Sequence, residues 1–66
     1  MKRYEIIDLD FSEKSLTLLE EMGIEHLDEL ENYSFNDLLN VKWMNLKSLR
    51  EIEDMVSSKG YILKNE

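Results

Sequence analysis

Apolar residues recur at helical spacing in two stretches of the chain. The first stretch carries Leu16 and Leu19, and Leu18 and Met22 widen the stripe that they form. This spacing places the apolar side chains on one face of an α-helix. The second stretch carries Leu46, Leu49, Ile52 and Val56, which are three, three and four residues apart. We predict helices over residues 12–22 and 46–59, the second with these four residues turned inward.

Cap residues mark where the two helices begin and end. Ser12 and Asn45 are candidate N-caps, because their side chains can accept a hydrogen bond from an amide of the first turn. Gly23 and Gly60 suit the position just after a helix, where a left-handed backbone ends it. The caps therefore fix the limits of both predicted helices.

Two shorter helices are predicted between them. One covers residues 26–32, and the other begins at the sequence SFND, residues 34–37, where Ser34 and Asp37 can form a variant of the capping box. This second short helix is expected to contain about six residues. The residues expected to be buried in the two short helices are Leu27, Leu30, Leu38 and Leu39.

Residues 1–11 carry a partly alternating set of apolar residues, which alone would also suit a strand. Because a single strand would have no partner, we expect an extended or one-turn segment packed over the helices. The prediction is therefore an all-α protein. It forms one domain over residues 1–66, a compact bundle of four to five short helices with helix-hairpin-helix motifs.

The composition excludes several classes of protein. The chain has 66 residues, no cysteine and a formal net charge of −7. It lacks disulfides and thiolate metal sites, which is consistent with the cytoplasm. The N-terminal bases precede no apolar run that would suit a signal peptide, and no stretch approaches the roughly 20 apolar residues of a membrane span. The strong negative charge opposes non-specific attraction to DNA or anionic lipid.

Catalysis is not expected. His26 is the only histidine, and a surface or capping role suits it better than a catalytic one. No nucleophile, base and orienting residue can be grouped, and so short a protein can hardly build a pocket. We predict a non-enzymatic protein without catalytic residues, metal or cofactor.

Charge is unevenly distributed along the sequence. Residues 15–40 hold seven acids and no base, whereas residues 41–50 hold three bases (Lys42, Lys47 and Arg50) and no acid. The acidic stretch is either a solvated face, a contact for a basic protein, or a mimic of DNA charge. The basic stretch is either ordinary surface or a small phosphate-binding face at a helix N-terminus.

The order of these features resembles the C-terminal domain of the bacterial RNA polymerase alpha subunit. The matching pieces are DLDFS before the first helix, GI after it, DEL and DLL in the short helices, and KSLREIEDM in the last helix. The closing KGYIL resembles the short hydrophobic tail of that family. The similarity runs without a gap from Ile6 to Leu63, so this protein looks like a stand-alone copy of the domain.

The resemblance implies a DNA-binding face. In the family an arginine early in the first helix and an asparagine one turn later contact the minor groove, and Lys14 and Thr17 stand at these positions. The family hairpin typically has asparagine, leucine, glycine, a basic residue, lysine and serine. The corresponding residues here are Trp43, Met44, Asn45, Leu46, Lys47 and Ser48. The candidate DNA contacts are Lys14, Thr17, Asn45, Lys47 and Ser48.

Several substitutions weaken this face. Lys14 offers a point charge in place of a planar fork. Asn45 tolerates the left-handed conformation that glycine would adopt, but its amide group could instead cap the last helix and occupy the place of a phosphate. Three phosphate contacts would give a salt dependence of only about −2.7 in logarithmic slope. DNA binding is therefore expected to be weak.

Three residues are candidates for protein contacts. Asp8 and Asp10 match positions where the family carries acids that contact the sigma factor, although both could also be ordinary exposed acids. Trp43 lies in a predicted loop, where it either packs against a helix or serves as a partly exposed anchor, since tryptophan is enriched at binding hot spots.

The sequence therefore predicts a transcription-related binding module. It would act mainly through contacts with RNA polymerase, sigma or a regulator, and would be a monomer. Weak binding to the DNA backbone and minor groove is the alternative. A structural or oligomerising protein without a role in transcription is a third hypothesis, which predicts a concentration-dependent dimer.

Overall fold

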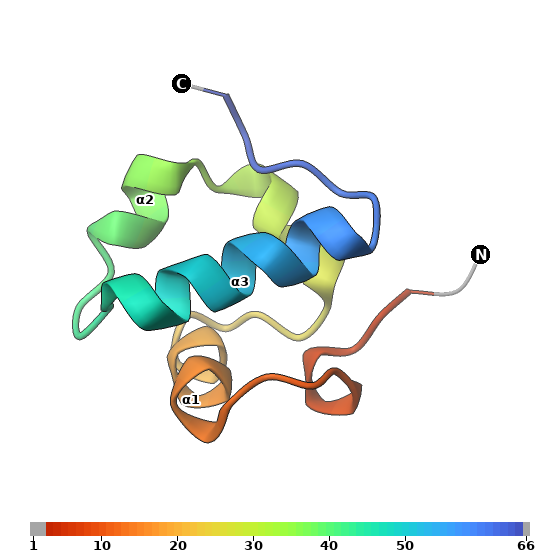
Figure 1. Ribbon diagram of the computed structural model, residues 1–66, viewed down its shortest axis with the longest axis horizontal. Helices are drawn as coiled ribbons and strands as arrows, with labels where there is room; N and C mark the ends of the chain where they lie inside the picture. Colours follow the sequence, from red (N-terminus) through yellow and green to blue (C-terminus); the bar gives the residue numbers. More distant parts are fainter. Residues whose placement is uncertain (1–2, 66) are drawn as a thin grey trace.

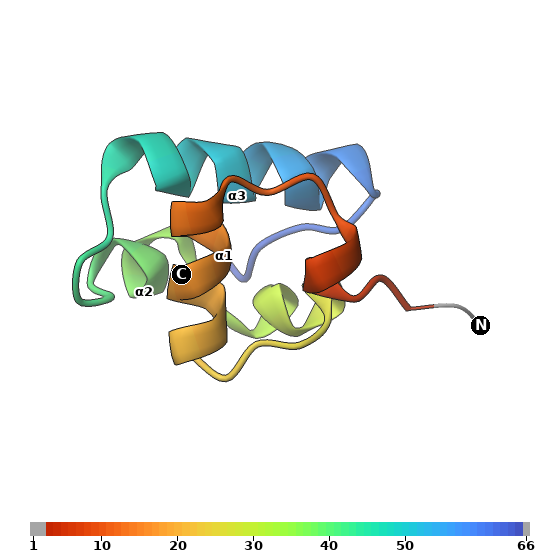
Figure 2. The same ribbon diagram turned by 90° about the horizontal axis from the view of Figure 1, so that it is seen from below.

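The structure, a computed structural model, describes residues 3–65. The described part of the protein is built from helices that follow one another through short connections (Figures 1 and 2). They are the 3-10 helix η1 (Ile6–Asp8), α1 (Glu13–Glu21), the 3-10 helix η2 (Leu27–Asn32), α2 (Phe35–Leu39) and α3 (Leu46–Ser58). The predicted all-α bundle of four to five short helices is confirmed.

The longest helix, α3, lies across the molecule, and α1 and η2 pack against it (Figure 1). Every helix contributes at least one side chain to a single core. The buried core residues are Ile6, Leu19, Ile24, Leu27, Leu30, Leu38, Leu49, Ile52 and Val56. The helical spacing seen in the sequence therefore corresponds to real burial on α1 and α3.

The predicted N-caps are confirmed. The Ser12 hydroxyl accepts a hydrogen bond from the Ser15 amide, and the Asn45 side chain accepts one from the Ser48 amide. Ser34 and Asp37 form the expected capping box at the start of α2. In each case a side chain satisfies an amide that has no partner within its own helix.

Both glycines end their helices as predicted. Gly23 has φ +80° and Gly60 has φ +83°, in the left-handed region that glycine adopts without steric cost. After Gly23 the backbone returns to the core through Ile24. After Gly60 it turns back so that Lys64 donates a backbone hydrogen bond to the carbonyl of Tyr33, 2.9 Å away.

In the N-terminal segment, residues 6–8 form one turn of 3-10 helix that lies over the other helices; residues 1–2 lie outside the described residues. Ile6 is only 1% exposed, and its amide donates to the carbonyl of Glu25 at 3.0 Å. The amide of Leu27 donates to the carbonyl of Tyr4 at 2.9 Å. These bonds attach η1 to the α1–η2 connection, so the segment is part of the packed structure.

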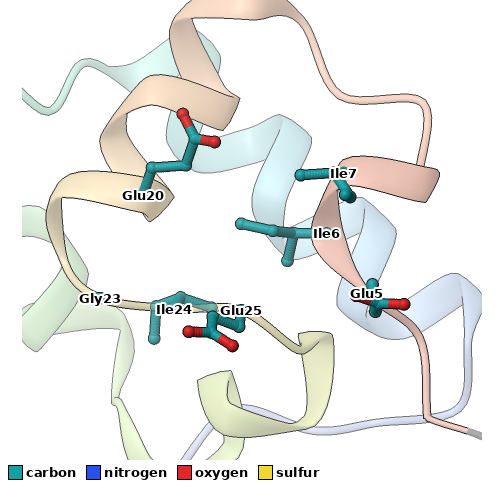
Figure 3. A pocket seen from close by; sticks show the side chains of 7 residues that line it. All are labelled: Glu5, Ile6, Ile7, Glu20, Gly23, Ile24 and Glu25. Atoms are coloured by element: carbon teal, nitrogen blue, oxygen red, sulfur yellow. The ribbon is translucent and has the colours of Figure 1, made fainter.

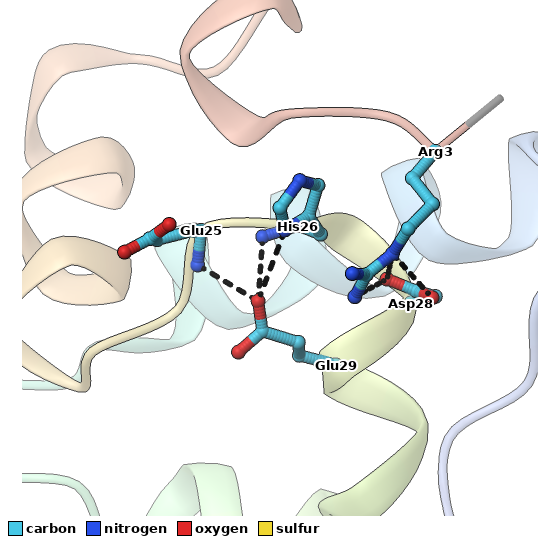
Figure 4. Close-up of polar contacts among 5 residues, drawn as sticks. All are labelled: Arg3, Glu25, His26, Asp28 and Glu29. Atoms are coloured by element: carbon cyan, nitrogen blue, oxygen red, sulfur yellow. Dashed lines mark hydrogen bonds and ion pairs between the residues drawn. The ribbon is translucent and has the colours of Figure 1, made fainter.

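Polar interactions of side chains strengthen this attachment (Figure 4). The Arg3 guanidinium donates through Nη2 and Nε to the carboxylate of Asp28, at 2.9 and 3.1 Å. This hydrogen bond holds the pKa of the Asp28 carboxyl below its usual value. Glu29 accepts from the amides of His26 and Glu25, at 2.9 and 3.1 Å, and the His26 amide is the main reason that the pKa of Glu29 is also lowered. η2 thus begins with a carboxylate at its positive end.

Two of the predicted core positions are wrong. Leu39 is 47% exposed, because α2 has only five residues and presents Leu38, one position earlier, to the core. Leu46 is 66% exposed, because it is the first residue of α3 and lies beyond the part of the helix that packs. The buried stripe of α3 therefore begins at Leu49.

Candidate functional site

The predicted DNA contacts occupy the first turns of α1 and α3 and the turn that precedes α3. Lys14 and Thr17 are exposed on α1, and Lys47 is exposed on α3. The structure brings Lys14 and Thr17 beside Trp43 around one shallow depression of about 450 Å³, which Glu13, Leu18 and Glu21 also line. Lys47 lies outside this depression and lines another one. The candidate DNA contacts therefore do not line one common depression.

Trp43 is the most unusual side chain of the site. It is 73% exposed, and the Nζ of Lys42 lies 5.6 Å from the centroid of its ring. Its φ is +70°, a left-handed value that is rare for a large residue. The amide of Met44 donates to the carbonyl of Val41 at 3.0 Å, so Trp43 is the third residue of a tight turn, where glycine or asparagine is favoured. The Trp43 side chain is therefore mostly exposed, although it shares one depression with residues of α1.

Asn45 does not adopt the left-handed conformation considered for it. Its φ is −134°, and its Oδ1 accepts from the amide of Ser48 at 2.8 Å. The Nδ2 of Asn45 is buried and has no hydrogen-bond partner within residues 3–65. Ser48 is 4% exposed. The Asn45 side chain therefore caps α3, and the buried Ser48 offers almost no surface to a ligand.

Sequence patterns do not identify Glu51, although its carboxylate binds the N-cap residue of α1. Its Oε1 accepts from the amide and the hydroxyl of Ser12, at 3.1 and 2.9 Å. The Ser15 hydroxyl, followed by the two Ser12 groups, lowers the pKa of the Glu51 carboxyl, and Lys47 lowers it further. A carboxylate thus already occupies a place where a helix N-terminus would hold a phosphate.

We expect Glu51→Gln to lower the free energy of unfolding by about 1 kcal/mol at pH 7, since it removes charge-assisted hydrogen bonds from a partly exposed site. The folded pKa of Glu51 lies below its unfolded value, so this contribution is present above that value. It disappears as the pH falls through the lower folded pKa. Urea unfolding of both proteins between pH 7 and pH 3 measures the difference. Asp54→Asn, which removes an exposed carboxylate, should have a smaller effect.

The remaining candidate residues, Thr17, Asp8 and Asp10, are exposed and lie on different segments of the chain. The Thr17 hydroxyl donates to the carbonyl of Glu13 at 2.9 Å, within α1. Asp8 ends η1, and Asp10 lies in the connection to α1; both side chains extend from the N-terminal segment. Both ribbon views place η1 and the turn over residues 41–44 on opposite sides of α1 (Figures 1 and 2). The helix η1, which ends at Asp8, therefore lies apart from the turn that contains Trp43.

Two other kinds of site are missing from residues 3–65. In this range no group of three or more histidine, cysteine, aspartate or glutamate side chains is arranged to hold a metal ion. No helix within the described residues has the length and apolar character that a membrane crossing requires.

The sequence was compared with protein families and with known proteins. The model of the family described as the C-terminal domain of the alpha chain of bacterial RNA polymerase matches residues 2–58. The DNA-directed RNA polymerase subunit alpha of Fusobacterium nucleatum is 38% identical over 58 residues, which cover 88% of this protein and 18% of that subunit. The same subunit of Mycoplasma mycoides is 38% identical over 53 residues, 80% of this protein and 17% of that subunit. The chain thus spans less than a fifth of the length of these relatives.

Proposed function

Because the chain belongs to the family of the C-terminal domain of the bacterial RNA polymerase alpha subunit, we propose that it is a binding module of transcription that acts mainly through protein contacts. The domain itself is not catalytic. The partner in this proposal is RNA polymerase, its sigma factor or a transcription regulator. Trp43 is the proposed anchor, and Asp8 and Asp10, on the N-terminal segment, form a proposed second contact.

The single observation that carries the proposal is the exposed, left-handed Trp43. A left-handed backbone costs roughly 1–2 kcal/mol in a residue with a side chain. A tryptophan that is 73% exposed repays little of this cost through packing in the free protein. If a partner covered on the order of 150 Å² of the ring, the burial would supply about 4 kcal/mol. The backbone conformation of Trp43 therefore costs free energy in the free protein, and burial of its ring in a complex would offset that cost.

Electrostatics also favour a protein partner over DNA. The net charge is −7, and Lys14 shares its depression with Glu13 and Glu21. The start of α1 is already bound by the Glu51 carboxylate. Each of these carboxylates repels a DNA phosphate that approaches the surface corresponding to the DNA-binding face of the family.

Weak DNA binding remains the second proposal, because family membership and the exposed Lys14 and Lys47 support it. Thr17, Asn45 and Ser48 complete the proposed set, although Ser48 offers little surface. Titration of a labelled AT-rich duplex at low salt tests it. DNA binding is supported if the protein binds the duplex saturably and if Lys14→Ala and Lys47→Ala each weaken that binding. The proposal is overturned if no binding occurs at near-millimolar protein.

The protein contact is tested with purified bacterial RNA polymerase, as core enzyme and with sigma, by biolayer interferometry. We expect saturable binding of the immobilised protein, and a weaker complex for Asp8→Asn/Asp10→Asn. The matched control is Glu31→Gln/Asp54→Asn, which removes two exposed charges elsewhere and should bind as the original protein does. Absence of binding to both polymerase forms at tens of micromolar contradicts the proposal. Sedimentation of the free protein checks the proposed monomer.

A further inference from the structure

A second hollow lies on the other side of α1, between η1 and the α1–η2 connection (Figure 3). Its volume is about 280 Å³, slightly below the range of roughly 300–1,000 Å³ that is usual for small-molecule pockets. It therefore has room for one long side chain of a partner rather than for a cofactor. Neither Asp8 nor Asp10 lines it, and it is separate from the depression beside Trp43.

The surface of this hollow is apolar at its centre and acidic at its edge. Ile6 and Ile24 are almost fully buried, whereas Ile7 is 63% exposed. In Figure 3 the Glu20 carboxylate lies on one side of Ile6 and Ile7, and the carboxylates of Glu5 and Glu25 lie on the other. None of the described residues that line the hollow is basic. An exposed isoleucine between three carboxylates suits a ligand with an apolar stem and a cationic end.

The end of α1 adds a second source of negative potential. Glu20 belongs to the last turn of α1, and this turn contains no basic residue. The C-terminus of a helix carries a partial negative charge that a cation normally stabilises. The lining residues supply no cation there, and Arg3, on the neighbouring segment, is bound to Asp28. The helix end and the three carboxylates therefore attract a cation from outside.

We propose that this hollow binds an arginine or lysine side chain from a basic segment of a protein partner. The aliphatic stem packs on the exposed Ile7, and the charged end lies among Glu5, Glu20 and Glu25. Long cationic side chains bind in this way, with the stem on an apolar surface and the charge directed to solvent or to carboxylates. The inference rests on the proposed function in requiring a protein partner, but it uses a different surface.

The test is a titration of the ¹⁵N-labelled protein with the capped tripeptide leucine-arginine-leucine, followed by NMR at low salt. We expect saturable shifts of the amides of residues 5–7, 20 and 24–25, with a dissociation constant on the order of millimolar, as expected for a single side chain. The neutral analogue leucine-citrulline-leucine should cause no saturable shift. Added salt should weaken the arginine complex.

Variants distinguish specific binding of the peptide in this hollow from non-specific electrostatic attraction to an acidic protein. Glu20→Gln/Glu25→Gln should weaken the arginine peptide at least fivefold, whereas the matched control Glu31→Gln/Asp54→Asn should leave it unchanged. Equal loss in both double variants, or equal binding of the citrulline peptide, overturns the proposal. Shifts of the same amides with protein concentration alone would assign the hollow to a second copy of the protein and would also overturn it.

The outcome is distinguishable from failure of the proposed function. If the arginine peptide does not bind while polymerase still binds through Trp43, only the hollow is wrongly assigned. If polymerase does not bind while the peptide does, the choice of partner is wrong and the cation site stands.

Discussion

Replacing Leu49 by alanine is expected to lower the free energy of unfolding by about 3 kcal/mol. Leu49 is fully buried on α3, and a buried Leu→Ala change typically costs about 2–5 kcal/mol. Total stability for 66 residues should lie at roughly 3–10 kcal/mol. One core side chain is therefore a large share of what holds this fold together. Urea unfolding followed by far-UV circular dichroism measures the loss.

Leu39→Ala is the matched control. It makes the same chemical change on α2, but Leu39 is 47% exposed, so the expected loss is below about 1 kcal/mol. Equal losses at the two positions would contradict the packing of these two helices. They would mean that the side of α2 that carries Leu39 is buried against the rest of the protein.

Replacing Trp43 by asparagine is expected to weaken binding to RNA polymerase by at least tenfold without destabilising the free protein. Loss of a tryptophan anchor typically costs about 2 kcal/mol or more of binding free energy. Asparagine, the residue of the family hairpin, tolerates the left-handed backbone better than tryptophan does. The free energy of unfolding should therefore stay the same or rise by up to about 1 kcal/mol. Interferometry and urea unfolding measure the two effects.

Ile62→Ala is the control for this variant. Ile62 is also 73% exposed, but it lies in the C-terminal tail after α3. Its replacement should change neither binding nor stability by more than a small amount. If Trp43→Asn destabilises the fold strongly, the ring stabilises the free protein and the anchor hypothesis is wrong. If it leaves binding unchanged, the partner contacts another surface.

Local sequence patterns predicted most of the fold. Ser12, Ser34 and Asn45 start their helices as expected, because N-capping depends only on a side chain and the next three residues. Gly23 and Gly60 end helices for an equally local reason. The errors at Leu39 and Leu46 lie where a helix is short or just beginning. At these places periodicity alone does not tell which side is covered.

The candidate site depends on contacts between residues far apart in the sequence, which local sequence patterns do not predict. Glu51 reaches Ser12 across 39 positions of sequence. The only local sign was that Ser15, in place of glutamate or glutamine, stands three residues after Ser12, so the capping box lacks its acid. The sequence allows Asn45 either a left-handed backbone or a capping role; Asn45 caps α3, and the left-handed residue of the turn is Trp43. The proposed arginine-binding hollow arises from η1 folding back on the α1–η2 connection, which tertiary packing alone determines.

The most direct test uses the indole N–H of Trp43, because the protein has one tryptophan and its signal is unique in a ¹⁵N spectrum. The labelled protein is titrated in parallel with RNA polymerase holoenzyme and with an AT-rich duplex. The predicted result is that the indole signal broadens and disappears as polymerase approaches an equimolar amount, while the duplex leaves it unchanged at near-millimolar concentration. A signal that shifts with the duplex and ignores the polymerase would contradict the account.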